Sequence, residues 1–169
     1  DVALIDQCSE FIINFCKEKH LYPDCFYGVP EGATKLGIIT QYKWALQNKC
    51  IPGSHILAMG RSKPKKHGDP KDKYFVGKPE GSVILLEDVT TTGNSMLETL
   101  DQLQAQQVNV IASIGLTNRE CKHENELVKD KVLKRGIPYY CLSHAKELLT
   151  QLTSETSPSH EVLEEIEAL

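Results

Sequence analysis

The feature that most restricts the fold of this chain is a run of four apolar residues at 83–86, bounded on both sides by turn-forming residues. Strands that are apolar at every position are typical of parallel sheets, because helices cover both faces of such a sheet. Glu87 and Asp88 follow and are expected to end the strand, and a turn at 90–93 precedes apolar residues at helical spacing. The order strand, turn, helix predicts a central strand of an α/β sheet.

The same alternation extends over most of the chain. Periodicity and turn residues predict helices over 4–20, 33–46, 120–135 and 145–152, and further strands over 25–27, 56–59, 108–116 and 137–141. The stretch 62–78 has few apolar residues and predicts an exposed loop or a strand pair that closes around a ligand. We therefore predict an α/β fold with a doubly wound, mostly parallel sheet over 1–152, and a polar linker with an acidic C-terminal helix over 153–169.

Composition and charge exclude several classes of protein. The length of 169 residues suits one domain, and 40% apolar with 25% charged residues is ordinary for a soluble one. The net charge of −4 argues against general nucleic-acid binding, and no apolar run is long enough to cross a membrane, so we expect a cytoplasmic protein. The six cysteines lack zinc-ligand spacing, which predicts free thiols and no metal ligands among the side chains. Residues 61–78 differ from the rest, with seven basic and two acidic residues, and indicate either an anion site or a solvated loop.

The turn after the central strand is the first candidate for a functional site. Ligands of open α/β sheets bind beyond the carboxyl ends of the strands. Residues 91–95 offer hydroxyls and backbone N–H groups at a helix N-terminus, where the helix dipole favours a phosphate. Glu87 and Asp88 would suit a ligand that also presents hydroxyl donors, as a ribose does, or that comes with Mg²⁺. The alternative is a capping turn, with Asn94 or Ser95 as the cap, beside a solvated strand end.

Three segments together resemble a known family. Residues 83–95 resemble the phosphoribosyl-diphosphate signature of type I phosphoribosyltransferases. Residues 27–36 are similar to the diphosphate-contacting loop of the orotate phosphoribosyltransferases within that family, and residues 61–68 resemble their mobile catalytic loop. The resemblance covers the chain from the first helix to about Leu152.

The resemblance implies a role for each matching residue. Arg61, Lys65 and His67 would meet the diphosphate, and with Asp88 they form the implied catalytic set. Glu87 and Asp88 would contact the ribose hydroxyls, and Thr91 and Arg119 the orotate base, where a guanidinium can bind a carboxylate with two hydrogen bonds. Arg119 could instead form a surface ion pair with Glu120 or Glu124. The implied substrate-binding residues are Glu31, Gly32, Glu87, Asp88, Thr90, Thr91, Thr92, Gly93, Asn94, Ser95 and Arg119.

The implied reaction is the transfer of a phosphoribosyl group from phosphoribosyl diphosphate to orotate, with Mg²⁺ bound mainly through the diphosphate and a homodimer with shared sites. The sequence departs from the family pattern at Ser62, where a second lysine is usual, and at Asn94, where a small residue is usual. It also begins at the helix that follows the family's base-covering hood. Two alternatives are therefore kept: a phosphoribosyltransferase for another base, and a non-catalytic regulator that binds phosphoribosyl diphosphate.

Overall fold

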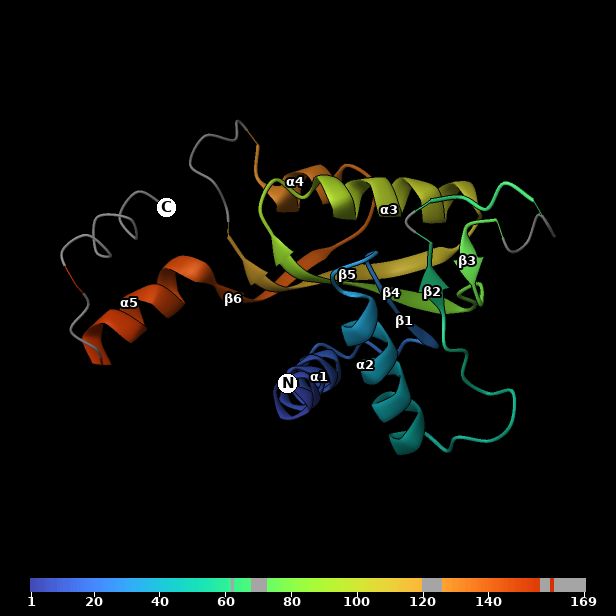
Figure 1. Ribbon diagram of the computed structural model, residues 1–169, viewed down its shortest axis with the longest axis horizontal. Helices are drawn as coiled ribbons and strands as arrows, with labels where there is room; N and C mark the ends of the chain where they lie inside the picture. Colours follow the sequence, from blue (N-terminus) through green and yellow to red (C-terminus); the bar gives the residue numbers. More distant parts are fainter. Residues whose placement is uncertain (62, 68–72, 120–125, 156–158, 160–169) are drawn as a thin grey trace.

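The computed structural model describes residues 1–61, 63–67, 73–119, 126–155 and 159, and it has an α/β fold (Figure 1). Its main sheet is parallel, with four strands in the order β1-β4-β5-β6. Those strands are β1 (Cys25–Gly28), β4 (Ser82–Thr90), β5 (Asn109–Asn118) and β6 (Tyr139–His144). A separate antiparallel pair joins β2 (Met59–Gly60) to β3 (Phe75–Val76). The helices are α1 (Val2–Glu18), α2 (Thr34–Gln47), α3 (Asn94–Ala105), α4 (Val128–Leu133) and α5 (Ala145–Glu155).

Helices cover both faces of the main sheet, with α1 and α2 on one face and α3 and α4 on the other (Figure 1). Side chains of β4 alternate between the two resulting cores. Ile84 and Leu86 belong to the cluster that includes residues of α1 and α2, whereas Val83 and Leu85 belong to the cluster with α3 and α4. All four are fully buried, which confirms the central strand predicted from the apolar run.

The helices that follow β1 and β4 lie on opposite faces of the sheet, and this arrangement creates a place where a ligand can bind. The helix that follows β1 lies on one side of the sheet, and the helix that follows the neighbouring β4 lies on the other. The turns that leave these two strands therefore diverge at the carboxyl edge of the sheet, where open α/β sheets in general have a crevice. In open α/β sheets, this is where ligands bind.

Two strand predictions need correction. Of residues 56–59 only Met59 is in a strand, and it pairs with Val76 and not with the main sheet. A short apolar run cannot identify its partner, and here Leu57 stays 54% exposed. Strand β4 does not end at Glu87 and Asp88 but continues to Thr90, because β5 pairs with it as far as Asn118. The basic stretch contributes only β3 to a strand pair, because its partner β2 lies before residue 62.

Helix and strand ends also differ from prediction. The described part of the helix predicted over 120–135 begins at Val128, because Leu127 is extended. β6 is displaced towards the C-terminus, to Tyr139–His144, and α5 continues past residue 152 to Glu155. The predicted acidic helix falls almost wholly outside the described residues, as do Ser62, Gly68, Glu120 and Glu124. Among the described helices, none is both long and apolar enough to span a bilayer.

Candidate active site

A small polar cavity lies at the turn between β4 and α3. It has a volume of about 40 Å³ and is lined by Glu87 and by residues 89–95. Helix α3 begins at Asn94, and its cap residue is Gly93 with φ +77°, with no side chain capping the helix. The alternative in which Asn94 or Ser95 caps the helix is therefore wrong. The N–H of Asn94 donates to the Thr92 hydroxyl at 3.4 Å. The next N–H groups of the first turn have no acceptor within the helix and can bind an anion, and the helix dipole favours negative charge at the same point.

Two remote residues fix the shape of this turn. A β-carbon on Gly93 would lie 2.9 Å from Cγ1 of Val128 in α4, and the φ angle is one that only glycine adopts easily. Thr90 is 1% exposed, and its hydroxyl is bonded to that of Tyr139 at 2.6 Å. The Thr90 hydroxyl is thus engaged within the protein, although Thr90 lines the cavity. Neither Val128 nor Tyr139 was identifiable from the sequence, because no local pattern connects them to the turn.

The two acids occupy different environments. Glu87 is 7% exposed, and burial, with the neighbouring charge of Asp88, raises the pKa of Glu87 to about 8. Asp88 is half-buried, and its Oδ1 accepts a hydrogen bond from the Val89 N–H at 2.8 Å. Its Oδ2 lies 3.0 Å from the position that a β-carbon on Gly32 would take. The loop after β1 therefore meets the acid from β4 in the crevice at the sheet edge.

Arg119 is exposed directly after β5, at the same edge. Its N–H donates to the carbonyl of Thr90 at 2.7 Å, which fixes its backbone next to the β4–α3 turn. The structure thus brings together three groups of predicted site residues: Glu31 with Gly32, residues 87–95, and Arg119.

Three of the predicted catalytic residues, Arg61, Lys65 and His67, do not line the cavity at the β4–α3 turn. The Arg61 N–H donates to Tyr74 at 2.9 Å and the Lys65 N–H to Lys73 at 2.8 Å, so the chain forms a hairpin that extends from β2 and β3. In Figure 1 β2 and β3 lie at the right of the view, whereas the turn that enters α3 lies further to the left. His67 is exposed on this hairpin. Arg61 does line a second cavity of about 570 Å³, which it shares with Glu31, Lys35 and Lys63.

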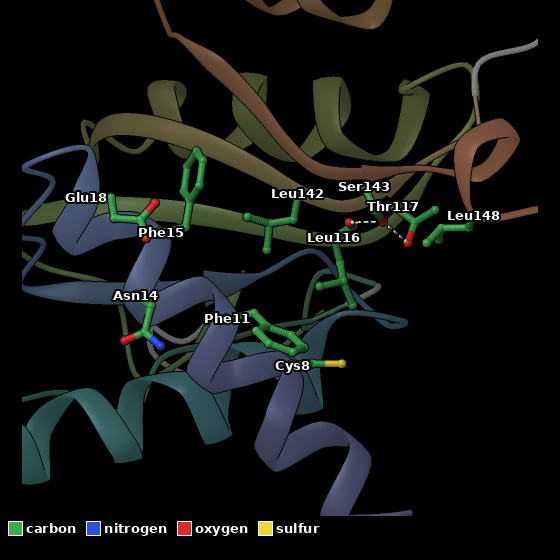
Figure 2. A pocket seen from close by; sticks show the side chains of 10 residues that line it. All are labelled: Cys8, Phe11, Asn14, Phe15, Glu18, Leu116, Thr117, Leu142, Ser143 and Leu148. Carbon is green, nitrogen blue, oxygen red and sulfur yellow. Dashed lines mark hydrogen bonds between the residues drawn. The ribbon is translucent and has the colours of Figure 1, made fainter. Parts of the chain in front are cut away.

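A larger groove of about 670 Å³ lies between α1, α5 and the ends of β5 and β6 (Figure 2). Phe11, Leu142 and Leu148 contribute to its mainly apolar wall. The hydroxyls of Thr117 and Ser143 are 3.0 Å apart, and Ser143 also bonds the carbonyl of Leu116 at 2.9 Å. Because these hydroxyls are already engaged and the wall is apolar, the cavity at the β4–α3 turn is the better candidate for a charged ligand.

The chain is similar in sequence and in structure to known proteins. No family model matches it. The orotate phosphoribosyltransferase of Bradyrhizobium sp. strain BTAi1 is 31% identical over 135 residues, which cover 75% of this chain and 65% of that relative. The orotate phosphoribosyltransferase of Francisella tularensis has a similar structure, with a TM-score of 0.67 and 16% identity over 98% of this chain and 77% of that one.

The chain is similar in sequence to orotate phosphoribosyltransferases over three quarters of its length. Its fold is that of the type I phosphoribosyltransferases. The Mycobacterium tuberculosis orotate phosphoribosyltransferase in complex with phosphoribosyl diphosphate has a TM-score of 0.63 at 14% identity, over 88% of this chain and 77% of that one. The chain spans less than two thirds of the length of the first curated relatives it matches.

Proposed function

We propose that this protein transfers the phosphoribosyl group of phosphoribosyl diphosphate to orotate. The products would be orotidine 5'-monophosphate and diphosphate, a step of pyrimidine nucleotide synthesis. The observation that carries the proposal is the polar cavity at the N-terminus of α3, which is lined by Glu87 and lies next to Asp88 at the carboxyl edge of β4. A ligand that fits must present a phosphate and hydroxyl donors together, as a phosphorylated ribose does.

Each part of the site has a role in this proposal. The N–H groups at the start of α3 hold the 5-phosphate, and Glu87 and Asp88 accept hydrogen bonds from the ribose hydroxyls. Arg119, at the same edge, binds the carboxylate of orotate with its guanidinium. The loop that contains Glu31 and Gly32 lies next to Asp88 and faces the diphosphate.

The leaving diphosphate gains negative charge, so the reaction needs cations. Among the described residues, no group of three or more His, Cys, Asp or Glu side chains could hold a metal ion. The donors present, the Asp88 carboxylate and the neighbouring Glu87, fit Mg²⁺ that arrives with the diphosphate, because Mg²⁺ prefers one or two carboxylates together with phosphate oxygens. The raised pKa of Glu87 applies without the metal, whose charge would favour the ionised form. When bound, Mg²⁺ would neutralise the leaving group. Arg61, Lys65 and His67 add positive charge when the hairpin closes over a site and excludes water.

The position of the basic hairpin supports a homodimer with shared active sites. Arg61 shares a cavity with Glu31 of its own chain, whereas Lys65 and His67 are exposed further along the hairpin, so these two side chains would serve the site of a second copy. Exposed apolar side chains occur near the base of the hairpin, including Leu57 at 54% and Val76 at 41% exposure, and Tyr42 of α2 is 55% exposed. Such side chains would be covered in a dimer.

Mixing two inactive variants tests the shared site. Lys65→Ala removes a cation of the hairpin, and Asp88→Asn removes an acid of the crevice. If the sites are shared, the mixed dimer has one site with neither defect and recovers up to about a quarter of wild-type activity after random exchange of subunits. No recovery in a mixture that sedimentation shows to contain mixed dimers would rule out shared sites.

We further propose that residues 1–152 form the phosphoribosyltransferase domain and that the protein acts in the cytoplasm. The parallel sheet and the helices on both of its faces lie within residues 1–152, except for the last turn of α5. Limited proteolysis followed by mass measurement of the stable fragment tests the boundary.

The activity is tested by mixing the protein with orotate, phosphoribosyl diphosphate and Mg²⁺ and measuring diphosphate release together with the loss of orotate absorbance. Release that requires orotate supports the proposal. Release with adenine or hypoxanthine, and not with orotate, would indicate another acceptor base. Binding of phosphoribosyl diphosphate with no release for any base would indicate a regulator.

A further inference from the structure

Helix α4 packs directly on the turn that forms the phosphate cavity. Its first residue, Val128, lies so close to Gly93 that a β-carbon there would come within 2.9 Å of Cγ1. At the other end, Arg135 binds Asp101 of α3 through two hydrogen bonds of 2.5 and 2.9 Å. The Nε2 of Gln104 in α3 also donates to the Arg135 carbonyl at 3.2 Å. Helix α4 is therefore attached to α3 and held against the turn that precedes α3.

Lys131 makes a specific contact with this turn. It follows Val128 by one helical turn, is half-buried, and donates a hydrogen bond from Nζ to the carbonyl oxygen of Thr92 at 3.2 Å. The two residues are 39 positions apart in the sequence, so no local pattern connects them. Thr92 lines the cavity and directly precedes the cap residue Gly93.

The orientation of the Thr92 carbonyl group affects how well the turn can bind an anion. A peptide carbonyl oxygen carries partial negative charge and would repel a phosphate if it turned into the cavity, whereas the N–H groups of the same turn attract one. A hydrogen bond from an ammonium group is stronger than one from a neutral donor. The hydrogen bond from Lys131 thus holds the Thr92 peptide in one orientation, with its carbonyl oxygen directed towards α4.

We infer that Lys131 is a positioning residue for the phosphate of the substrate: it fixes the Thr92 peptide so that the N–H groups at the start of α3 face the anion. This inference rests on the proposed function, because it assumes that the cavity binds the 5-phosphate. Lys131 acts through the turn and does not take part in the displacement of diphosphate. Its loss should therefore weaken phosphate binding and leave the chemical step almost unchanged.

The experiment compares wild-type protein with Lys131→Met, Lys131→Arg and Lys129→Met. Methionine keeps an unbranched side chain but has no donor, and arginine keeps a charged donor. Lys129 is exposed on the same helix and provides the matched control. Binding of ribose 5-phosphate is measured by titration calorimetry, KM and kcat are measured with phosphoribosyl diphosphate and orotate, and thermal unfolding is recorded without ligand.

We expect Lys131→Met to raise both the Kd for ribose 5-phosphate and the KM for phosphoribosyl diphosphate about tenfold. We expect kcat and the KM for orotate to change less than about twofold, Lys131→Arg to restore most of the affinity, and Lys129→Met to match wild type. If Lys131→Met does not fold, Lys131→Gln is measured in the same way, and a loss of affinity smaller than tenfold but larger than in Lys131→Arg still supports the inference.

Unchanged phosphate affinity in a folded Lys131→Met or Lys131→Gln protein overturns the inference while leaving the proposed function intact. An equal loss of phosphate affinity in Lys131→Arg also overturns the inference, because a hydrogen bond from a charged donor would then not explain the affinity of the wild-type protein. If wild-type protein binds neither ribose 5-phosphate nor phosphoribosyl diphosphate, the proposed function itself fails, and the role of Lys131 with it.

Discussion

Replacing Glu87 by glutamine should make the protein more stable at alkaline pH and change its stability little at acid pH. Burial of this side chain, with the charge of Asp88 beside it, raises the pKa of Glu87 from 4.5 to about 8. The side chain is 7% exposed, so solvent screens the effect little. Glutamine has nearly the same shape and carries no charge at any pH.

The size of the stability difference follows from the pKa shift of Glu87. One pKa unit corresponds to about 1.4 kcal/mol, so ionising Glu87 costs the native state about 4–5 kcal/mol more than it costs the unfolded chain. Between the two pKa values the native state still holds the proton and the unfolded state has lost it. The free energy of unfolding therefore falls as pH rises through this window and levels off above the native pKa. Relative to wild type, we expect Glu87→Gln to gain about 3–5 kcal/mol between about pH 5 and about pH 9.

Urea unfolding at several pH values measures this difference. The single tryptophan, Trp44, is 3% exposed, so its fluorescence reports on unfolding. Glu98→Gln, at an exposed position of α3, is the control and should differ from wild type by the same amount at every pH. If the difference between Glu87→Gln and wild type is the same at both ends of the pH range, the reasoning about buried charge at this site is wrong.

Three further substitutions test the site. Gly93→Ala should lower the free energy of unfolding by about 1–3 kcal/mol, because φ is +77° and Val128 occupies the space, and a urea titration that matches wild type would contradict this. Tyr139→Phe removes the 2.6 Å hydrogen bond to the buried Thr90 hydroxyl, which keeps only its 3.4 Å bond to the Thr117 carbonyl, and should cost about 1–3 kcal/mol in the same assay; a loss below about 0.5 kcal/mol would contradict this. Lys65→Ala should reduce kcat by about 10²–10³-fold, which corresponds to about 2–4 kcal/mol, without a change in melting temperature, because Lys65 is exposed. Unchanged turnover in that variant would remove the hairpin from the mechanism.

Much of the fold and part of the site could be predicted because their signals are local. The apolar run at 83–86 identified the central strand, and the structure confirms that helices cover it on both faces. The helical spacing after the turn identified α3, and the Thr/Gly-rich turn at its start does line a polar cavity. Glu87 lines the same cavity, and Asp88 lies beside Gly32 at the carboxyl edge of the sheet.

Contacts between remote segments decided the rest. Residues 56–59 were predicted as a strand, but a strand also requires a ladder partner, and only Met59 has one. The position of the basic hairpin depends on how β2 pairs with β3, and the hydrophobic periodicity of the sequence does not predict that pairing. In the same way, the role of Lys131 depends on where α4 packs.

The sequence by itself thus determined the order of strands, turns and helices and the chemistry of the turn before α3, because those properties depend on neighbouring residues. Only the tertiary structure decided which loop meets Asp88, which helix packs on the turn before α3, and where the basic side chains of residues 61–67 lie relative to that turn. These are distances between segments far apart in the chain, and they are determined by packing of the whole domain.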